Sequence, residues 1–331
     1  MITQKNFNKY TDNLLDFNKY PAVEYKILKD FKNLDYNDEK LKKLRIEFLS
    51  SDIVAEMAEC QDYDGHWGPF FSKDYSKKDK IPTTSVGIER CLYIGLSKVD
   101  NDILFVINDW LENVFDDKIA YDYYEKNERA LHSQRYRFAE CLESITPNTE
   151  IIDSLYDKWL YIADEAFKSG EYSYDDDKNI QHQLLGTHQQ RLSYMPVKLL
   201  TMRKNNLPVE LNDKMRDYYA KHAAENGHFW DKNLYEFPEN FTNPKTSRWF
   251  HTLNYVNMFR NTEKYMQTAL EWLENVQNSD NLWDYGTQTK DPWGYFKYFS
   301  LTKNHKYNRI INCTIEVLTV FKQYLDNNEK P

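Results

Sequence analysis

Glycine, proline and long apolar runs are all scarce in this sequence. Nine Gly and ten Pro among 331 residues are few for a protein with many tight β turns, so the composition favours long helices. No apolar run approaches the ~18 residues of a membrane-spanning helix. The first residues also lack the apolar segment of a signal peptide. We therefore expect a cytoplasmic protein without a membrane span.

Cysteine is also rare, and its four copies lie far apart in the chain. They are Cys60, Cys91, Cys141 and Cys313. No two of them have the C-x-x-C spacing that is typical of redox motifs and zinc sites. The pattern predicts buried, reduced thiols, no metal site and no cofactor.

The sequence has no block of positive charge. Its 43 Lys and Arg are outnumbered by 52 Asp and Glu, which gives a formal net charge of −9. A protein that binds nucleic acid needs a basic surface to neutralise the phosphates. The composition therefore excludes a general nucleic-acid-binding protein.

Aromatic residues, in contrast, are abundant and make up 16% of the chain. With 41% hydrophobic residues in all, the sequence is too apolar for a disordered protein. Its length is sufficient for a large core in one large domain or in two smaller ones.

Apolar residues recur at helical spacings of three and four along most of the chain, and this predicts an all-α protein. The helices alternate between two kinds, separated by polar connections rich in aromatic residues. First helices are predicted over 39–59, 101–115, 149–167, 209–225 and 262–277, and second helices over 83–97, 132–145, 187–204, 246–260 and 308–325. Residues 10–34 supply one more helix. A repeat of roughly 50 to 60 residues indicates an array of helical hairpins.

An aromatic residue recurs in the connections, beside a glycine or asparagine. It is Trp67, Tyr172, Trp230 and Trp283 in turn. We expect the ring to pack over its hairpin and become buried. A nearby Gln or Asp side chain is expected to accept hydrogen bonds from the N–H groups that begin a neighbouring helix.

Two of these connections carry a longer shared pattern. Met57, Gln61, Gly65 and Trp67 form the first copy, and Leu273, Gln277, Asn281 and Trp283 form the second. This pattern resembles the QW motif of squalene–hopene cyclases, oxidosqualene cyclases and their relatives. The likeness extends over residues 40 to 325, with close matches only in the first and last repeats and Asn281 in place of the motif's glycine.

The resemblance implies an (α/α) toroid of about five to six helical hairpins, the fold that also occurs in the β subunits of protein prenyltransferases. On this interpretation, residues 1–331 form a single domain, and residues 1–38 are an N-terminal helical extension that closes the ring. The second helix of each pair would line a central cavity. An activity as a lyase, isomerase or transferase would follow, although the repeated motif itself carries no chemistry.

The catalytic signatures of these families are missing. Cyclases of this type protonate their substrate with a D-x-D-D acid, and the nearest string here is Tyr174-Asp175-Asp176-Asp177-Lys178. We interpret this string as a solvated acidic loop, with a proton donor as the alternative. Prenyltransferases bind zinc through a D-x-C pair that this sequence does not contain. Glu89-Arg90-Cys91 keeps that spacing with the wrong acid.

Arginines near the starts of four second helices are the strongest candidates for ligand contacts. They are Arg135, Arg191, Arg248 and Arg309. A cation in the first turn of a helix opposes the helix dipole by about 0.3–1 kcal/mol, so each requires a compensating anion. That anion is either an acid of the connections, such as Asp284, or an anionic ligand that the arginine and the helix amides hold together.

Other residues complete the candidate site. The catalytic candidates are His188, His251 and Glu89, because histidine titrates near neutral pH. Further ligand-binding candidates are His132, Trp67 and Trp293. Trp293 belongs to an aromatic segment that either closes the array or covers a ligand.

Three functions stay open at this point. The first is a terpenoid cyclase-like or prenyltransferase-like protein that binds, and transforms if it is an enzyme, a small amphiphilic ligand with an anionic head. The second is a carbohydrate-active α/α-barrel lyase or hydrolase that acts on acidic sugars. The third is a non-catalytic binding or scaffolding protein in which the arginines are structural.

Overall fold

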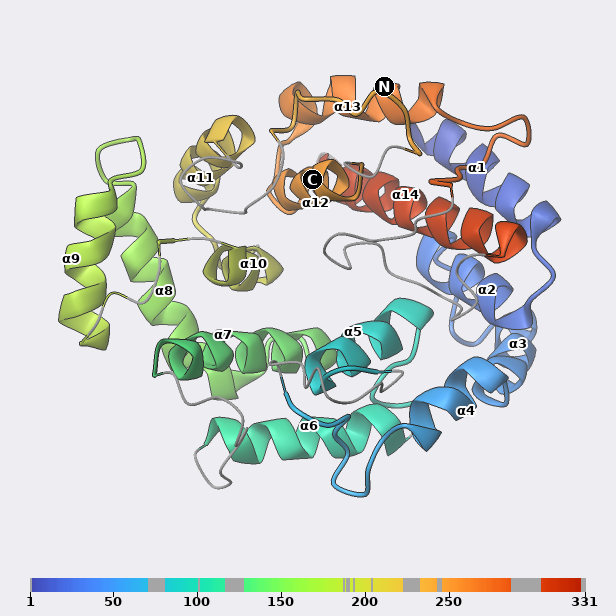
Figure 1. Ribbon diagram of the computed structural model, residues 1–331, viewed down its shortest axis with the longest axis horizontal. Coiled ribbons are helices and arrows are strands. Elements are labelled where there is room, and N and C mark those ends of the chain that lie inside the picture. The colour runs from blue at the N-terminus through green and yellow to red at the C-terminus, as the bar shows by residue number, and fades with distance from the viewer. Residues whose placement is uncertain are drawn as a thin grey trace. The chain divides into compact units, whose positions relative to one another are not determined.

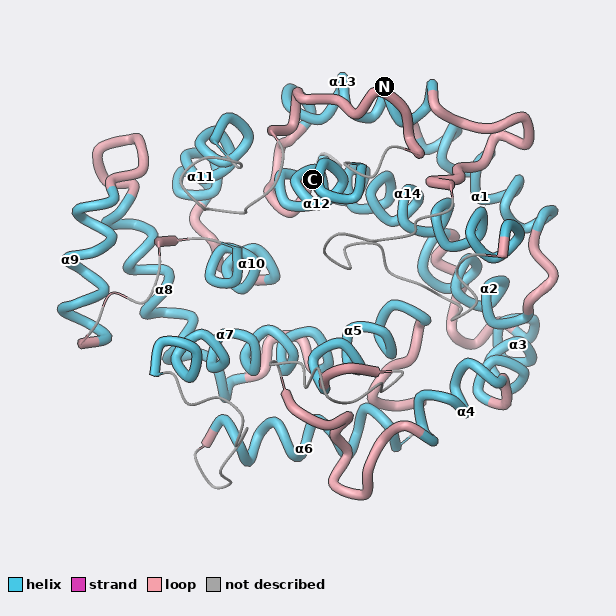
Figure 2. The backbone as a smooth tube through the Cα atoms, viewed as in Figure 1, coloured by secondary structure: helices cyan, strands magenta, loops and turns pink. Residues whose placement is uncertain are grey.

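The computed structural model describes residues 2–70, 81–100, 102–116, 128–186, 188, 191–192, 194–203, 205–222, 233–242, 246–286 and 305–328, with only the backbone at 128–133. These residues form helices joined by loops and turns, and no strand occurs among them (Figure 2). The all-α prediction is confirmed. None of the helices in this part of the chain is both long and apolar enough to cross a membrane.

The chain divides into two compact units. Unit 1 comprises residues 1–19, 31–33 and 160–331, and unit 2 comprises residues 20–30 and 34–159. The sequence predicted a single toroidal domain in which residues 1–38 close the ring. This concerns the arrangement of the two units and stays a prediction.

Unit 2 contains the helices from α2 to the first half of α8. Its helices are α2 (Pro21–Lys26), α3 (Glu39–Leu49), α4 (Asp52–Glu59), α5 (Thr84–Ile94), α6 (Asp102–Phe115) and α7 (Glu128–Ile145), followed by the 3-10 turn η2 (Glu150–Ile152) and the start of α8 (Asp153–Ala166). Helix α7 packs against both α5 and α6, and α2 packs against α3 (Figure 1). The apolar stripe of α6, which includes Ile103, Ile107 and Leu111, is buried.

Unit 1 contains the N-terminal helix and the helices that follow residue 159. Its helices are α1 (Gln4–Phe17), the second half of α8, α9 (Tyr174–Leu185), α10 (Tyr194–Met202), α11 (Val209–His222), α12 (Thr246–Val256), α13 (Glu263–Asn275) and α14 (Lys306–Asn328). Helix α14 packs against α1 and α13 (Figure 1). Helix α13 buries a single stripe, whereas the residues of α14 from Asn308 to Leu318 are all buried.

The two close copies of the repeated motif fold alike. The indole Nε1 of Trp67 donates to the Met57 carbonyl (3.0 Å), and that of Trp283 donates to the Leu273 carbonyl (2.8 Å). The backbone N–H of each tryptophan donates to a threonine of the following helix, Thr84 (3.0 Å) or Thr314 (3.1 Å). Both rings are buried, as expected. We call each of these segments, 57–67 and 273–283, a tryptophan turn.

The substitution of asparagine for glycine in the second tryptophan turn has a backbone explanation. Gly65 and Asn281 have φ angles of +92° and +54°, and asparagine is one of the few residues with a side chain that tolerates the left-handed region. A Cβ atom at Gly65 would also lie 2.7 Å from the side chain of Val106, so the first copy requires glycine for space as well.

The glutamine of the first tryptophan turn bonds in the opposite sense from our prediction. Gln61 does not accept from helix N–H groups there; its Nε2 donates to the carbonyls of Gly65 (2.6 Å) and Ile103 (3.0 Å). It still links the turn to the first turn of the neighbouring helix α6. Trp230, the corresponding aromatic residue of another connection, lies outside the described residues.

Several helices differ from the predictions. The helix expected over 39–59 breaks where the Ser50 hydroxyl bonds to the Ile46 carbonyl (2.9 Å), and the helix expected over 10–34 breaks before Pro21, which begins α2. Helix α10 begins at Tyr194 instead of 187, which leaves Pro196 in its first turn, where proline is tolerated. Helix α9 was not predicted.

Candidate functional site

The acidic string of residues 174–178 is the start of helix α9, not a solvated loop. The hydroxyl of Ser173 accepts from the backbone N–H of Asp176 and caps the helix. Carboxylates in a first turn interact favourably with the helix dipole, so three consecutive aspartates suit this position. Asp177 is fully buried, which corrects the sequence-based interpretation.

Three hydrogen bonds replace the water that Asp177 loses on burial. Its carboxylate accepts from the hydroxyl of Tyr172 (2.6 Å), the amide of Gln181 (2.6 Å) and the backbone N–H of Leu192 (2.8 Å). Because both oxygens are occupied by donors and shielded from solvent, Asp177 is unsuited to donate a proton to a substrate.

Leu192 is held from both sides of its backbone. Its N–H bonds to Asp177, and its carbonyl accepts from the hydroxyl of Tyr219 on α11 at 2.5 Å. Burial raises the pKa of Tyr172, and the neighbouring Asp177 carboxylate raises it further. Burial likewise raises the pKa of Tyr219 well above its usual value. Both phenols therefore remain protonated donors at neutral pH.

Arg191, next to this anchored residue, stacks on an aromatic ring. Its guanidinium carbon lies 4.3 Å from the centroid of the Tyr174 ring, and His188 meets the same ring edge-on with centroids 5.4 Å apart. Among the described residues, no carboxylate lies within 4.0 Å of the Arg191 guanidinium. We call Tyr174, His188 and Arg191 the Arg191 cluster. The fold thus brings together two of the predicted site residues, on a segment that precedes α10.

His251 lies in a second aromatic group of unit 1. On α12, its ring contacts Tyr255 at 4.4 Å and Tyr194 at 5.5 Å between centroids. Tyr194 and Tyr255 contact each other edge to face at 4.2 Å. Tyr194 is the first residue of α10 and follows Arg191 by three positions.

The other candidate arginines differ in their surroundings. Arg309, in the first turn of α14, makes a two-pronged ion pair with Asp284, at 2.6 and 2.9 Å. This is one of the internal pairs that the sequence had suggested. Arg248 lies in the first turn of α12 and is half-buried.

Arg135 is not in a first helical turn, because α7 begins at residue 128. Its side chain is exposed, and its Nη2 donates to the carbonyl of Phe115 (3.2 Å). Phe115 is the last residue of α6, so this arginine satisfies one of the free carbonyls at a helix C-terminus. The dipole argument that selected Arg135 does not apply to it, and it does not apply to Arg191 either, because α10 begins only at Tyr194.

Glu89 lies on α5 of unit 2, whereas the two candidate histidines, His188 and His251, lie in unit 1. Arg137 of α7 bridges Glu89 and Glu140 with Nη atoms 2.5 Å from each carboxylate. Arg137 and Glu140 are buried, and our sequence analysis overlooked both. Their spacing of three residues on one helix, typical of an ion pair, was the available signal.

The remaining predicted residues have less to offer a ligand. Trp67 is 2% exposed, and its only side-chain donor is bonded within its own hairpin. His132 lies on α7 at a position where the side chain is outside the described part, and Trp293 is also outside the described residues. Within that part of the chain, no group of three or more His, Cys, Asp or Glu is placed to bind a metal ion.

The chain matches no known protein family, no curated protein sequence and no solved structure.

Proposed function

We propose that this chain is a toroidal array of helical hairpins, of the terpenoid cyclase and protein prenyltransferase kind, that binds a small ligand with an anionic head. The near-identical hydrogen bonds of the two tryptophan turns support the repeat. On this proposal, the buried polar residues of the second helices line the cavity of the ring.

The single observation that carries the ligand-binding proposal is the setting of Arg191. A guanidinium stacked on a tyrosine is held in place while its N–H groups remain available at its edge. Such a fork suits a phosphate or carboxylate, which it contacts through two parallel hydrogen bonds. The described residues place no carboxylate in ion-pair contact with Arg191, in contrast to Arg309, which Asp284 neutralises.

The ligand is proposed to be amphiphilic. His188 adds a second basic group beside Arg191, and the half-buried rings of Tyr194 and His251 offer aromatic surface in the same unit. An isoprenoid diphosphate has the required chemistry. If a reaction occurs, His188 is the group suited to move a proton, because Asp177 is buried and fully hydrogen-bonded.

Isothermal titration calorimetry tests this proposal with three probes: inorganic diphosphate, a fifteen-carbon isoprenyl diphosphate and an oligomeric uronate. We expect the isoprenyl diphosphate to bind most tightly. Arg191→Ala should weaken this binding by about 1.5–3 kcal/mol, the contribution of a charged hydrogen bond. Arg135→Ala is the matched control and should leave the affinity unchanged, because Arg135 caps α6 in the other unit.

The alternatives give different results in the same experiment. Binding of the uronate alone, dependent on Arg191, would identify the carbohydrate-active protein instead. If no probe binds and Arg191→Ala only lowers thermal stability, the protein is a scaffold and the proposed ligand site is wrong.

A further inference from the structure

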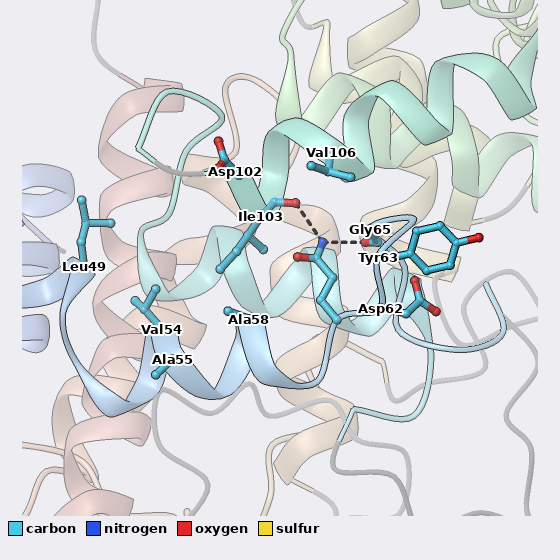
Figure 3. Close-up of a pocket in the computed structure, with 11 residues that line it drawn as sticks. Leu49, Val54, Ala55, Ala58, Asp62, Tyr63, Gly65, Asp102, Ile103 and Val106 are labelled. Carbon is cyan, nitrogen blue, oxygen red and sulfur yellow. Dashed lines mark hydrogen bonds between the residues drawn. The ribbon is translucent and has the colours of Figure 1, made fainter.

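A groove lies on unit 2 between helices α4 and α6, beside the first tryptophan turn. Its volume is about 350 Å3, and its apolar lining includes Val54 and Ala58 of α4 and Ile103 and Val106 of α6 (Figure 3). Asp62 and Tyr63 lie at the end near Gly65, and Asp102 lies on the α6 side (Figure 3). The predicted ligand residues play no part in this groove.

Large exposed hydrophobic side chains line this groove or lie on the same helices within one turn of its lining residues. Tyr63, which lines it, is 92% exposed, and Phe105, adjacent to Val106 on α6, is 55% exposed. Ile46 of α3 is 67% exposed and lies one helical turn before Leu49, another lining residue. Clustered exposure of this kind marks interaction surfaces, whereas isolated exposed hydrophobics are unremarkable.

The two segments that form the groove carry only negative charge. Residues 51–70 and 102–116 contain nine Asp and Glu and no Lys or Arg. Asp52, Glu59, Asp64, Asp102 and Asp109 are exposed. Such a surface repels nucleic acid and anionic membranes and favours an occupant that presents apolar side chains beside positive charge.

Helix α3 of the same chain presents such a surface. Lys42 and Lys43 precede Ile46 by four and three residues, so they lie on the same face of the helix. The side chain of Lys43 is 81% exposed, and Glu47 is 4.0 Å away. Lys42 pairs with Glu39 at 2.9 Å, but this pair is exposed to water and therefore weak. This face therefore extends from Lys42 and Lys43 through Ile46 and Leu49 to the groove, which has an apolar lining and negative charges around it.

We propose that this face, defined by Lys42, Lys43, Ile46 and the α4–α6 groove, associates with the same face of a second copy of the chain. A surface with a basic apolar part next to an acidic apolar part is complementary to itself under a two-fold rotation. In such a dimer, the lysines and Ile46 of each copy approach the groove of the other.

Sedimentation velocity of the full chain, from low concentrations to about 100 µM, tests this inference. We expect a dimer in dilute buffer. The charge-reversed variants Lys42→Glu/Lys43→Glu and Asp102→Lys/Asp109→Lys should each raise the dimer dissociation constant at least about tenfold, because like charges then face each other. All four positions are exposed, so the folds should be retained, which circular dichroism checks.

Mixing the two charge-reversed variants provides the decisive control. One variant then has an all-acidic face and the other a face with added basic groups, so a mixed dimer should form at concentrations where each variant alone is monomeric. A chain that is monomeric at every concentration overturns the proposal. A dimer that neither variant weakens also overturns it, because association then uses another surface. Neither result bears on the Arg191 cluster.

Discussion

A buried charge is tolerated only where hydrogen bonds replace the solvation that it loses. Asp177 meets this condition through three donors, and one of them is the backbone of Leu192, far along the chain from the start of α9. The carboxylate therefore fixes the segment that carries Arg191. Its role is to position the cluster, through the backbone, without contacting a ligand.

Asp177→Asn should destabilise the protein by about 2–3 kcal/mol, because an amide cannot accept from three donors and leaves one buried donor unpaired. Asp176→Asn is the matched control. Asp176 is exposed and contributes only through the helix dipole, so its substitution should cost less than about 1 kcal/mol. Urea denaturation measures both changes, and equal effects would contradict the role given to Asp177.

Trypsin cleavage after Arg191 gives a second readout of the same anchor. Tyr219→Phe removes the hydroxyl that holds the Leu192 carbonyl, so cleavage of the Arg191–Leu192 bond should accelerate by roughly tenfold or more, following the loss of about 1–2 kcal/mol of local stability. Mass spectrometry of the early fragments measures this rate. An unchanged rate at this bond would show that the hydroxyl does not hold the segment.

A different buried carboxylate makes stability depend on pH. Burial alone would raise the pKa of the Asp100 carboxyl, but hydrogen bonds from Ser97 and Arg45 outweigh burial and hold it below the usual value of 3.8. A group with a lowered pKa in the folded state stabilises the protein fully above its unfolded pKa. This contribution is lost as the pH falls through the folded pKa.

Asp100→Asn should therefore be less stable than the wild type at neutral pH, and the difference should shrink as the pH falls below about 4. The reason is that the wild-type carboxyl also becomes neutral in that range. Denaturation curves from pH 7 to pH 3 measure the difference. A gap that stays constant over this range would exclude the lowered pKa as its cause.

At the scale of elements, the tryptophan turns join each connection to the helix that follows it. The Thr314 hydroxyl accepts from the buried backbone N–H of Trp283, so Thr314→Val should cost about 1–3 kcal/mol by leaving this donor unpaired. Thr319→Val on the same helix is the control, since Thr319 is exposed and its loss should stay within about 0.5 kcal/mol. Thermal or urea unfolding distinguishes the two.

Helical periodicity predicted most elements because an amphipathic stripe is a local property of the sequence. The apolar stripes of α6 and α13 are examples, and both helices appear where they were expected. Helix α9 was overlooked because its first turn, Tyr174 to Asp177, is polar and resembles a loop. Its stability depends on the Ser173 cap and on burial of Asp177, and only the second of these is invisible in the local sequence.

At the scale of the whole molecule, the chain crosses between its two compact units four times, after residues 19, 30, 33 and 159. The last crossing falls inside helix α8, which begins at Asp153 and ends at Ala166. A helix shared in this way is difficult to unfold in one unit alone. We therefore expect the units to unfold together.

Differential scanning calorimetry should show one transition, and Trp67→Ala and Trp283→Ala should both shift it downward, because each leaves a large cavity at a cost of about 3–5 kcal/mol. The two tryptophans belong to different units. Two separate transitions, each sensitive to only one of the substitutions, would instead show that the units fold independently and would count against a single domain.

The sequence by itself determined the helical class, the positions of most helices and the burial of the two tryptophans, because helical periodicity and turn chemistry depend on residues close together in the chain. Only the tertiary structure decided which charged groups are paired. The carboxylate of Asp177 accepts from the backbone of Leu192, and Arg137 pairs with Glu89, across gaps of 15 and 48 residues. Such pairs depend on the packing of whole helices, which brings together groups that no local pattern connects.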